Sequence, residues 1–165
     1  TCVARGTGTL VHDNVADFSL VNCLGERVSL HSLCGESKAI WSILVTGWCS
    51  ACEDYLPQVL RAKSQLEGQG MSPTVWVLLG EDASGNPPTQ NYCQGYARSH
   101  NLDPAQTFID PGWQTLFTNI WPYLVNNTIG TPWEALFDGD NMEYLWHSGD
   151  GYAMPMDLLQ STLQD

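Results

Sequence analysis

The sequence predicts an α/β fold in which helices flank a central mixed β-sheet. Residues 39–46 form a nearly continuous apolar, β-branched run, which is typical of a strand buried on both faces of a sheet. A second compact apolar run lies at 74–79, and apolar residues recur at helical spacing between the two runs. Because a helix connects two buried strands, this part of the chain predicts a parallel β-α-β unit.

Short strands are expected before this unit and further elements after it. Residues 6–11 and 18–22 are apolar-alternating runs, and 28–30 follows a turn at Gly25, so the beginning of the chain predicts small strands and a hairpin. The helix of the β-α-β unit is expected over about 50–67. The later elements are expected as a helix at 90–100, a short strand at 107–109, a short helix at 113–120, a hairpin of strands at 133–137 and 143–147, and a final helix at 155–163.

Length and composition favour one folded domain over residues 1–165. A chain of 165 residues has an ordinary domain size, and 43% apolar residues supply a packed core, which excludes an intrinsically disordered chain. No repeat, linker or low-complexity segment divides the sequence.

The charge excludes a nucleic-acid partner. Eighteen acidic residues against six lysines and arginines give a net charge of −12, and nine acidic residues follow Arg98, the last lysine or arginine. Phosphate backbones need cationic side chains, which the second half of the chain lacks. An acidic surface also avoids anionic membrane surfaces.

Six cysteines indicate an exported protein. Their number is even and exceeds what a cytosolic chain of this length usually carries, so a periplasmic or otherwise extracytoplasmic location is expected. No apolar run approaches the roughly 20 residues of a membrane span, and no leader precedes Thr1. We therefore expect a mature or trimmed form, which a missing N-terminal segment could tether to a membrane.

Cys49 and Cys52 form a Cys-x-x-Cys pair where the buried strand ends and the helix begins. Unpaired backbone N–H groups and the helix dipole stabilise a thiolate at such a helix start, so Cys49 is the expected attacking sulfur. Cys52, one turn into the helix, is within disulfide reach and is the expected resolving sulfur. A static disulfide or half of a zinc site is the alternative. The chain has no second pair of ligands at zinc-finger spacing, so no metal is expected.

Three motifs around this pair resemble one known family. Residues 46–52, Thr-Gly-Trp-Cys-Ser-Ala-Cys, are similar to an Ala-Thr-Trp-Cys-x-x-Cys turn, and Pro57 matches a helix-kinking proline five residues past the second cysteine. Residues 130–132, Gly-Thr-Pro, are similar to the Gly-x-Pro that opens the family's fourth strand. The family is the thioredoxin-like superfamily, specifically its TlpA/ResA-like (redoxin) exported thiol-disulfide oxidoreductases.

The resemblance implies a thioredoxin-like fold with an added N-terminal β-hairpin. It covers about residues 16–163, with the leading hairpin at 16–20 and 25–33, and leaves 1–15 as an N-terminal extension. It implies an enzyme that exchanges disulfides with cysteines of partner proteins. Such an enzyme uses its redox-active disulfide, no other cofactor, and a thiol electron donor or acceptor.

The resemblance also implies which residues bind the partner. The family's proline bond is cis and lies against the active-site disulfide, so Thr131-Pro132 would be cis and Thr131 would offer its backbone to an extended partner chain. Trp48, beside Cys49, is expected at the rim of the site. The acidic half of the chain would include the Thr131 side, so the partner is expected to be neutral or basic around its target cysteine.

The sequence departs from the family at two proton acceptors. Thioredoxins keep a buried carboxylate six residues before the first cysteine, where this chain has Ile43. ResA-like members carry a glutamate three residues past the second cysteine, where it has Tyr55. Glu53 is the nearest carboxylate in sequence and is the candidate for proton transfer, although acids in a first helical turn often serve only the dipole.

The remaining cysteines, Cys2, Cys23, Cys34 and Cys93, can pair in three ways. Cys23 and Cys34 bracket the leading hairpin, so Cys23–Cys34 is the first choice and leaves Cys2–Cys93. Buried free thiols are the alternative.

Two other functions fit parts of the pattern. Thr46 and Cys49 also match the Thr-x-x-Cys turn of peroxiredoxins, although Ser42 stands where their proline would and no activating arginine can be placed. The two thiols could instead bind or deliver copper as soft ligands, with His147 as the candidate third ligand.

Overall fold

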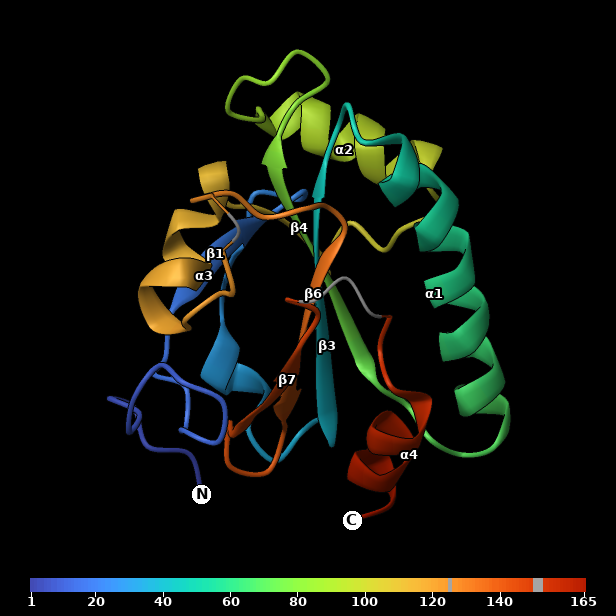
Figure 1. The fold of residues 1–165 in the computed structure, drawn as a ribbon. Coiled ribbons are helices and arrows are strands. Elements are labelled where there is room, and N and C mark those ends of the chain that lie inside the picture. Colours follow the sequence, from blue (N-terminus) through green and yellow to red (C-terminus); the bar gives the residue numbers. More distant parts are fainter. Residues whose placement is uncertain (125, 150–152) are drawn as a thin grey trace.

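The computed structural model of the chain describes residues 1–124, 126–149 and 153–165. In this part of the chain a seven-stranded mixed sheet has the order β2-β1-β5-β4-β3-β6-β7 (Figure 1). The strands are β1 (Ser19–Asn22), β2 (Arg27–Ser29), β3 (Ala39–Thr46), β4 (Thr74–Glu81), β5 (Thr107–Ile109), β6 (Trp133–Asp138) and β7 (Tyr144–His147). The α-helices are α1 (Ser50–Gly68), α2 (Gln90–Ser99), α3 (Gln114–Asn119) and α4 (Met156–Gln164).

The central β-α-β unit has the predicted order. Every residue of β3 is buried, as expected of a strand covered on both faces. β3 pairs in parallel with β4, and α1 connects them. On its other side β3 pairs antiparallel with β6, which pairs antiparallel with β7, so the predicted hairpin is confirmed. This pairing sets Leu44 opposite Trp133 and so brings the end of β3 beside the beginning of β6.

Helices cover both faces of the sheet (Figure 1). α1, α2 and α4 contribute to one apolar cluster and α3 to another, so these groups lie on opposite faces. Side chains of β3 alternate between the clusters. Trp41, Ile43 and Val45 belong to the cluster of α1, whereas Ile40 and Leu44 belong to that of α3.

The strand predicted at 6–11 is wrong, whereas the strands expected at 18–22 and 28–30 are present as β1 and β2 within one residue. Gly6 has a positive φ of 63°, and its N–H donates to the carbonyl of Val3 at 2.8 Å, which makes a local turn. The N–H of Leu10 donates to a side-chain oxygen of Asp13 at 2.9 Å. Backbone groups that bond within such turns are not available for a ladder with a neighbouring strand.

The predicted pairing of the four other cysteines is also wrong. The disulfides are Cys2–Cys34 and Cys23–Cys93, in place of Cys23–Cys34 and Cys2–Cys93. β1 pairs with β5 as well as with β2, which carries Cys23 into the cluster beneath α2, where Cys93 meets it. Cys34 lies instead near the carbonyl of Asp140, to which the N-terminal amine also donates at 3.2 Å, so its neighbour is Cys2.

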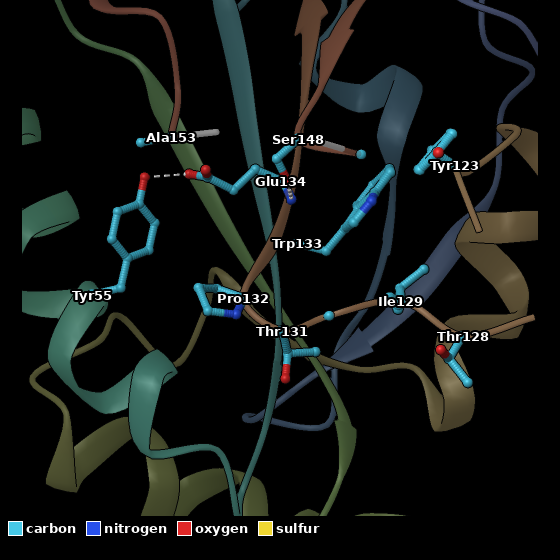
Figure 2. A pocket seen from close by; sticks show the side chains of 12 residues that line it. Tyr55, Tyr123, Thr128, Ile129, Thr131, Pro132, Trp133, Glu134, Ser148 and Ala153 are labelled. Atoms are coloured by element: carbon cyan, nitrogen blue, oxygen red, sulfur yellow. Dashed lines mark hydrogen bonds between the residues drawn. The ribbon is translucent and has the colours of Figure 1, made fainter. Parts of the chain in front are cut away.

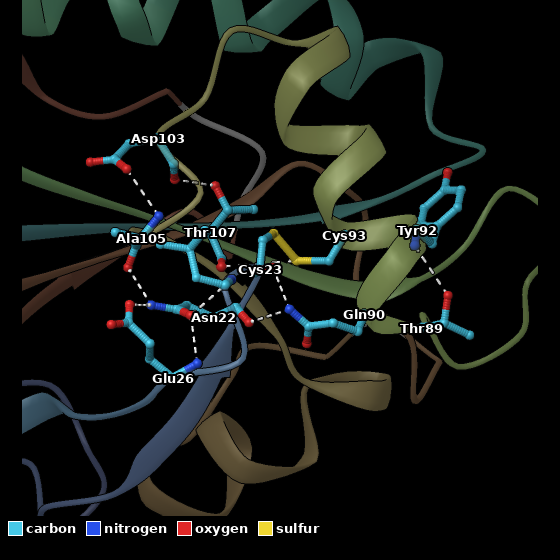
Figure 3. The surroundings of a disulfide bond; sticks show 11 residues. Asn22, Cys23, Glu26, Thr89, Gln90, Tyr92, Cys93, Asp103, Ala105 and Thr107 are labelled. Atoms are coloured by element: carbon cyan, nitrogen blue, oxygen red, sulfur yellow. Dashed lines mark hydrogen bonds between the residues drawn. A yellow bond between two sulfur atoms is a disulfide. The ribbon is translucent and has the colours of Figure 1, made fainter.

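The Cys23–Cys93 disulfide lies among hydrogen bonds that join three segments (Figure 3). The side-chain amide of Asn22, at the end of β1, donates to the carbonyl of Ala105 at 3.2 Å. The side chain of Gln90, at the start of α2, donates to the carbonyl of Cys23. Both cysteines are fully buried, so this bridge links the N-terminal hairpin to α2 inside the protein.

Candidate active site

Cys49 and Cys52 lie at the junction of β3 and α1. Cys49 is the N-terminal cap of α1, and its Sγ accepts the backbone N–H of Cys52 at 3.0 Å. The two sulfurs form a disulfide. Cys49 is 4% exposed and Cys52 is 0% exposed, so the first sulfur is the more accessible. When the bridge is reduced, the N–H groups at the start of α1 favour the thiolate of Cys49.

The loop before β6 faces this pair. The Sγ of Cys49 lies 3.4 Å from the carbonyl oxygen of Thr131, and the Thr131-Pro132 peptide bond is cis. The contact follows from the sheet, because the register of β3 and β6 brings the two strand ends together. Thr131 and Pro132 are both partly exposed, so the edge of this loop is open beside the disulfide.

Trp48 forms an exposed side of the site. The residue is 56% exposed, and its indole N–H donates to the carboxylate of Glu81 at 2.6 Å. Glu81 is the last residue of β4, so the neighbouring strand fixes the ring. An exposed indole held in this way offers a flat apolar surface next to Cys49.

A buried carboxylate lies in β6, two residues after Pro132. Glu134 is 2% exposed, and its Oε1 accepts hydrogen bonds from the Trp41 indole at 2.9 Å and from the Tyr55 hydroxyl at 2.6 Å. Figure 2 shows the phenol of Tyr55 extending from α1 toward this carboxylate. Because Trp41 belongs to β3, the carboxylate joins three elements of the fold.

Burial governs the ionisation of Glu134 and Tyr55. It raises the pKa of the Glu134 carboxyl group, and the hydrogen bonds from Tyr55, Trp41 and the backbone of Met154 act in the opposite direction. Burial and the nearby charge of Glu134 raise the pKa of Tyr55, so its hydroxyl remains a donor. The carboxyl group of Glu134 therefore holds a proton to a higher pH than an exposed glutamate does.

A cavity of about 480 Å³ connects the buried carboxylate with the loop that faces Cys49. Tyr55 and Glu134 line one part of it, and Thr131 and Pro132 line another (Figure 2). The other lining residues are Tyr123, Thr128, Ile129, Gly130, Trp133, Ser148, Gly149 and Ala153. Thr131, whose carbonyl contacts the Sγ of Cys49, therefore shares this cavity with the buried carboxylate.

Solved structures share this arrangement of strands and helices, whereas no family model and no curated protein matches the sequence. A candidate protein disulfide isomerase from Bacteroides thetaiotaomicron has a TM-score of 0.70 and 15% identity, over 99% of this chain and 96% of that one. A thioredoxin family thiol:disulfide interchange protein from Chlorobium tepidum has a TM-score of 0.63 and 15% identity, over 99% and 100%. The fold is thioredoxin-like. A secreted disulfide oxidoreductase from Mycobacterium tuberculosis has the same fold, with a TM-score of 0.60 and 16% identity over 89% and 94%.

Within the thioredoxin-like fold, Glu134 lies beside both positions where the family pattern has a carboxylate. It is directly opposite Ile43 in the register of β3 and β6, and it accepts the hydrogen bond of Tyr55. The sequence did not predict this residue, because positions counted from the cysteines fall on β3 and α1, whereas Glu134 lies on β6. The signal in the sequence is a charged residue inside the apolar run at 133–137.

Glu53 follows Cys52 in α1, and its backbone N–H donates to the carbonyl of Cys49 at 3.3 Å, but its side chain has different surroundings. Trp48 and the Thr131-Pro132 loop lie beside Cys49 of the disulfide. Glu53 is exposed on the first turn of α1 and lines a different cavity, together with Gly47 and residues of α2. It does not line the cavity of Thr131 and Glu134.

Within the described ranges, no group of three or more histidine, cysteine or acidic side chains could hold a metal ion. His147, the candidate copper ligand, stacks on Trp133 with ring centroids 5.6 Å apart, and its Nδ1 accepts the N–H of Gly149 at 3.0 Å. Through these contacts the ring of His147 packs against β6.

Proposed function

We propose that this protein is a thiol-disulfide oxidoreductase that exchanges disulfides with partner proteins through Cys49 and Cys52. The observation that carries the proposal is the position of Cys49 at the start of α1, with its Sγ 3.4 Å from the carbonyl of Thr131. This position puts a stabilised thiolate beside an open peptide edge, with which an extended partner chain can pair. The names of the proteins that share the fold support the proposal.

The proposed reaction has two displacement steps. The thiolate of Cys49 attacks one sulfur of a partner disulfide, and the other partner sulfur leaves with the electron pair of the broken bond. Cys52 then attacks the Sγ of Cys49, releases the second partner sulfur and closes the disulfide. The partner gains two electrons, and the pair of cysteines loses two. A thiol electron donor restores the reduced pair, and the same steps in reverse oxidise a partner dithiol, with no cofactor besides the redox-active disulfide.

Trp48, Thr131 and Pro132 bind the partner in this proposal. Thr131 offers backbone hydrogen-bonding groups at the partly exposed edge of its loop, and Pro132 fixes that edge against Cys49. Trp48 adds an apolar surface on which a partner side chain can pack. The binding groups thus lie around the attacking sulfur.

We place the protein in the periplasm or another extracytoplasmic compartment. All six cysteines are in disulfides, which persist in oxidising surroundings. The Mycobacterium tuberculosis protein of the same fold is described as a secreted protein. No helix in residues 1–124, 126–149 and 153–165 is long and apolar enough to cross a membrane.

The partner is proposed to be neutral or basic around its target cysteine. Thr131 and Pro132 belong to the part of the chain that follows Arg98 and has no lysine or arginine. Because salt screens attraction between exposed charges, kcat/KM for a basic substrate protein is expected to fall several-fold between ~0.05 M and ~0.5 M salt. Steady-state turnover of a basic and a neutral substrate is the measurement. If salt lowers kcat/KM equally for the two substrates, the acidic charge of the protein does not select its partner and serves only solubility.

Replacing Cys49 with serine tests the proposed function. We expect the wild-type protein to reduce a protein disulfide in the presence of a dithiol. Cys49→Ser is expected to lower this turnover on the order of a thousandfold or more, because the attacking sulfur is lost. Consumption of hydrogen peroxide and binding of copper are measured on the same samples and on Cys52→Ser.

Two results would contradict the proposal. Peroxide consumption that survives Cys52→Ser, with no disulfide exchange in the wild type, would favour a peroxidase that uses Cys49. Tight copper binding with neither activity would favour a copper-binding or delivery module.

A further inference from the structure

The proposed exchange leaves one proton without an acceptor, because Cys52 must lose its thiol proton before its sulfur attacks Cys49. We infer that the carboxylate of Glu134, held in place by the Tyr55 hydroxyl, takes up this proton through the cavity beside the cis-proline loop. The inference rests on the proposed function and concerns its second step. Tyr55 acts as a positioning residue for Glu134.

The position of Cys52 creates the need for an acceptor. Its side chain is completely buried in the apolar cluster beneath α1. Apolar surroundings disfavour a thiolate, so a thiol there ionises poorly unless a base assists it. The start of α1 favours the thiolate of Cys49, whose Sγ already accepts the backbone N–H of Cys52.

Glu134 is on the face of the sheet that Cys52 covers. Trp41, which donates to Glu134, and Ile43, which lies opposite it, both belong to the apolar cluster that contains Cys52. Opposed residues of antiparallel strands point to the same face, with Cβ atoms about 5 Å apart. The carboxylate is therefore one strand away from Ile43, beneath the same helix.

Tyr55 connects this carboxylate with the helix that carries both cysteines. It lies three residues after Cys52 in α1, a spacing that puts two side chains on neighbouring parts of one helical face. Its hydroxyl donates to Glu134 at 2.6 Å (Figure 2). The phenol thus bridges the Cys52 side of α1 and β6.

Among the residues that the structure describes, no other acid is equivalent to Glu134. Asp110 is the second buried carboxylate among the described residues, and it accepts the backbone N–H groups of Thr115 and Leu116 at 3.0 Å each. Leu116 belongs to the cluster on the opposite face of the sheet. Glu53 is exposed and lines a different cavity. Glu134 is therefore the buried carboxylate on the face of Cys52.

The cavity gives the carboxylate and the cis-proline loop beside Cys49 one shared space. It has a volume of about 480 Å³, and Glu134, Tyr55 and Thr131 line it. The carbonyl of Thr131 contacts the Sγ of Cys49 at 3.4 Å. A cavity of this size has room for several water molecules, which can bridge the polar groups of Glu134, Tyr55 and Thr131 where these do not touch.

Protons and electrons balance in this step. The S–H bond of Cys52 breaks, its proton goes to Glu134, and its electron pair forms the bond to Cys49. The bond between Cys49 and the partner sulfur breaks, and that electron pair leaves with the partner as a thiolate. The thiolate then takes the proton from Glu134, or it stays ionised or takes a proton from solvent while Glu134 releases its own proton to solvent, and both routes restore the carboxylate.

The ionisation of Glu134 suits an acceptor, since burial raises its pKa and a protonated state is accessible. Tyr55 is the titratable group among the described residues that bonds to it. Trp41 from β3 and the backbone of Met154 are uncharged donors. Cys49 and Cys52 add two titratable thiols when the disulfide is reduced.

The experiment separates the two displacement steps with a small aromatic disulfide, dithiobis-nitrobenzoate, added to the reduced protein. Attack by Cys49 releases one coloured thiolate, and attack by Cys52 releases a second, so stopped-flow absorbance resolves two phases. This leaving group needs no proton, and the second phase therefore reports the loss of the proton from Cys52. Both phases are recorded from about pH 4 to about pH 10, a range that brackets the ordinary pKa values of Glu and Cys.

Glu134→Gln is expected to slow the second phase about ten- to a hundredfold near neutral pH and to leave the first phase within about threefold. In the wild type the second phase accelerates as Glu134 loses its proton. In Glu134→Gln it accelerates only as the thiol itself ionises, around pH 8.5 and above, so the two rates converge at high pH. Glu134→Asp is expected to restore part of the lost rate, and Tyr55→Phe to slow the second phase by a smaller factor.

Glu36→Gln is the matched control, because Glu36 is exposed and precedes the opposite end of β3. It is expected to change neither phase. A wild-type pH profile of the second phase in Glu134→Gln would overturn the inference, as would loss of that profile in Glu53→Gln alone. If near-UV circular dichroism shows that Glu134→Gln is unfolded, an unchanged profile in Tyr55→Phe overturns it. Absence of any second phase in the wild type would refute the proposed role of Cys52 itself, which is a distinct failure.

Discussion

Cys52→Ala is expected to stop turnover and to leave the partner protein covalently attached to Cys49. Cys49 keeps its place at the start of α1, so its thiolate still attacks the partner disulfide. No sulfur then lies one turn away to break the mixed disulfide, which decays only through external thiols. Turnover is expected to fall on the order of a hundredfold or more, with roughly one partner bound per protein.

Non-reducing electrophoresis and intact-protein mass spectrometry measure this adduct. Cys49→Ala is the matched control, since it keeps the buried thiol of Cys52 and loses the accessible one. This control is expected to form no adduct. Dithiothreitol is expected to reduce the mixed disulfide of Cys52→Ala and so release the partner. An adduct on Cys52 of the control would reverse the two roles.

The largest loss of stability is expected from removing the buried disulfide in Cys23→Ala/Cys93→Ala. The bridge spans a sequence separation of 70, and the entropy of closing a loop of that length predicts a loss of about 4 kcal/mol in the free energy of unfolding. Both residues are fully buried, so the two alanines also leave a small cavity where the sulfurs were, which adds to the loss. Guanidinium denaturation followed by circular dichroism measures the loss.

The Cys2–Cys34 bridge offers the comparison. Its separation of 32 gives nearly the same loop entropy. We expect a smaller loss from Cys2→Ala/Cys34→Ala, because the bridge ties down a terminal segment in which many residues are exposed. Equal losses for the two pairs would assign the effect to loop length alone. A loss below about 1 kcal/mol for the Cys23–Cys93 pair would contradict the expected role of that bridge.

The elements with a strong local pattern could be predicted from the sequence. β3 and β4 are continuous apolar runs, and the helix between them has both a regular stripe and a glycine-rich end, so their order and direction follow from the chain itself. The segment 6–11 has only a weak alternation, and its glycines and the carboxylate of Asp13 favour turns over a strand.

The disulfide pairing could not be predicted, because it depends on contacts between distant segments. A hairpin suggests that the cysteines on either side of it are neighbours. In the structure β1 also pairs with β5, and this second pairing carries Cys23 away from Cys34 and toward α2. Sequence spacing contains no information about that second neighbour.

The residues of the candidate site also fall into a group that the sequence predicts and one residue that it does not. Cys49, Cys52 and the Gly-Thr-Pro motif are recognisable along the chain, because a strand end, a helix start and a short motif place them. Glu134 acquires its place from the register of β6 against β3, which sets it opposite Ile43. Reasoning along the chain therefore finds the sulfurs and misses the carboxylate.

The spacing of two residues between Pro132, just before β6, and Glu134 within it has an evolutionary consequence. Side chains of a strand alternate between its two faces, so residues two apart point to the same side. One residue inserted between them would turn the carboxylate toward Ile40 and Leu44, into the apolar cluster on the other face. We therefore expect insertions and deletions to be rare at this point among relatives that use the acid. Distant relatives that keep this acid should carry the spacing Thr-Pro-x-Glu even where little else of the sequence is shared.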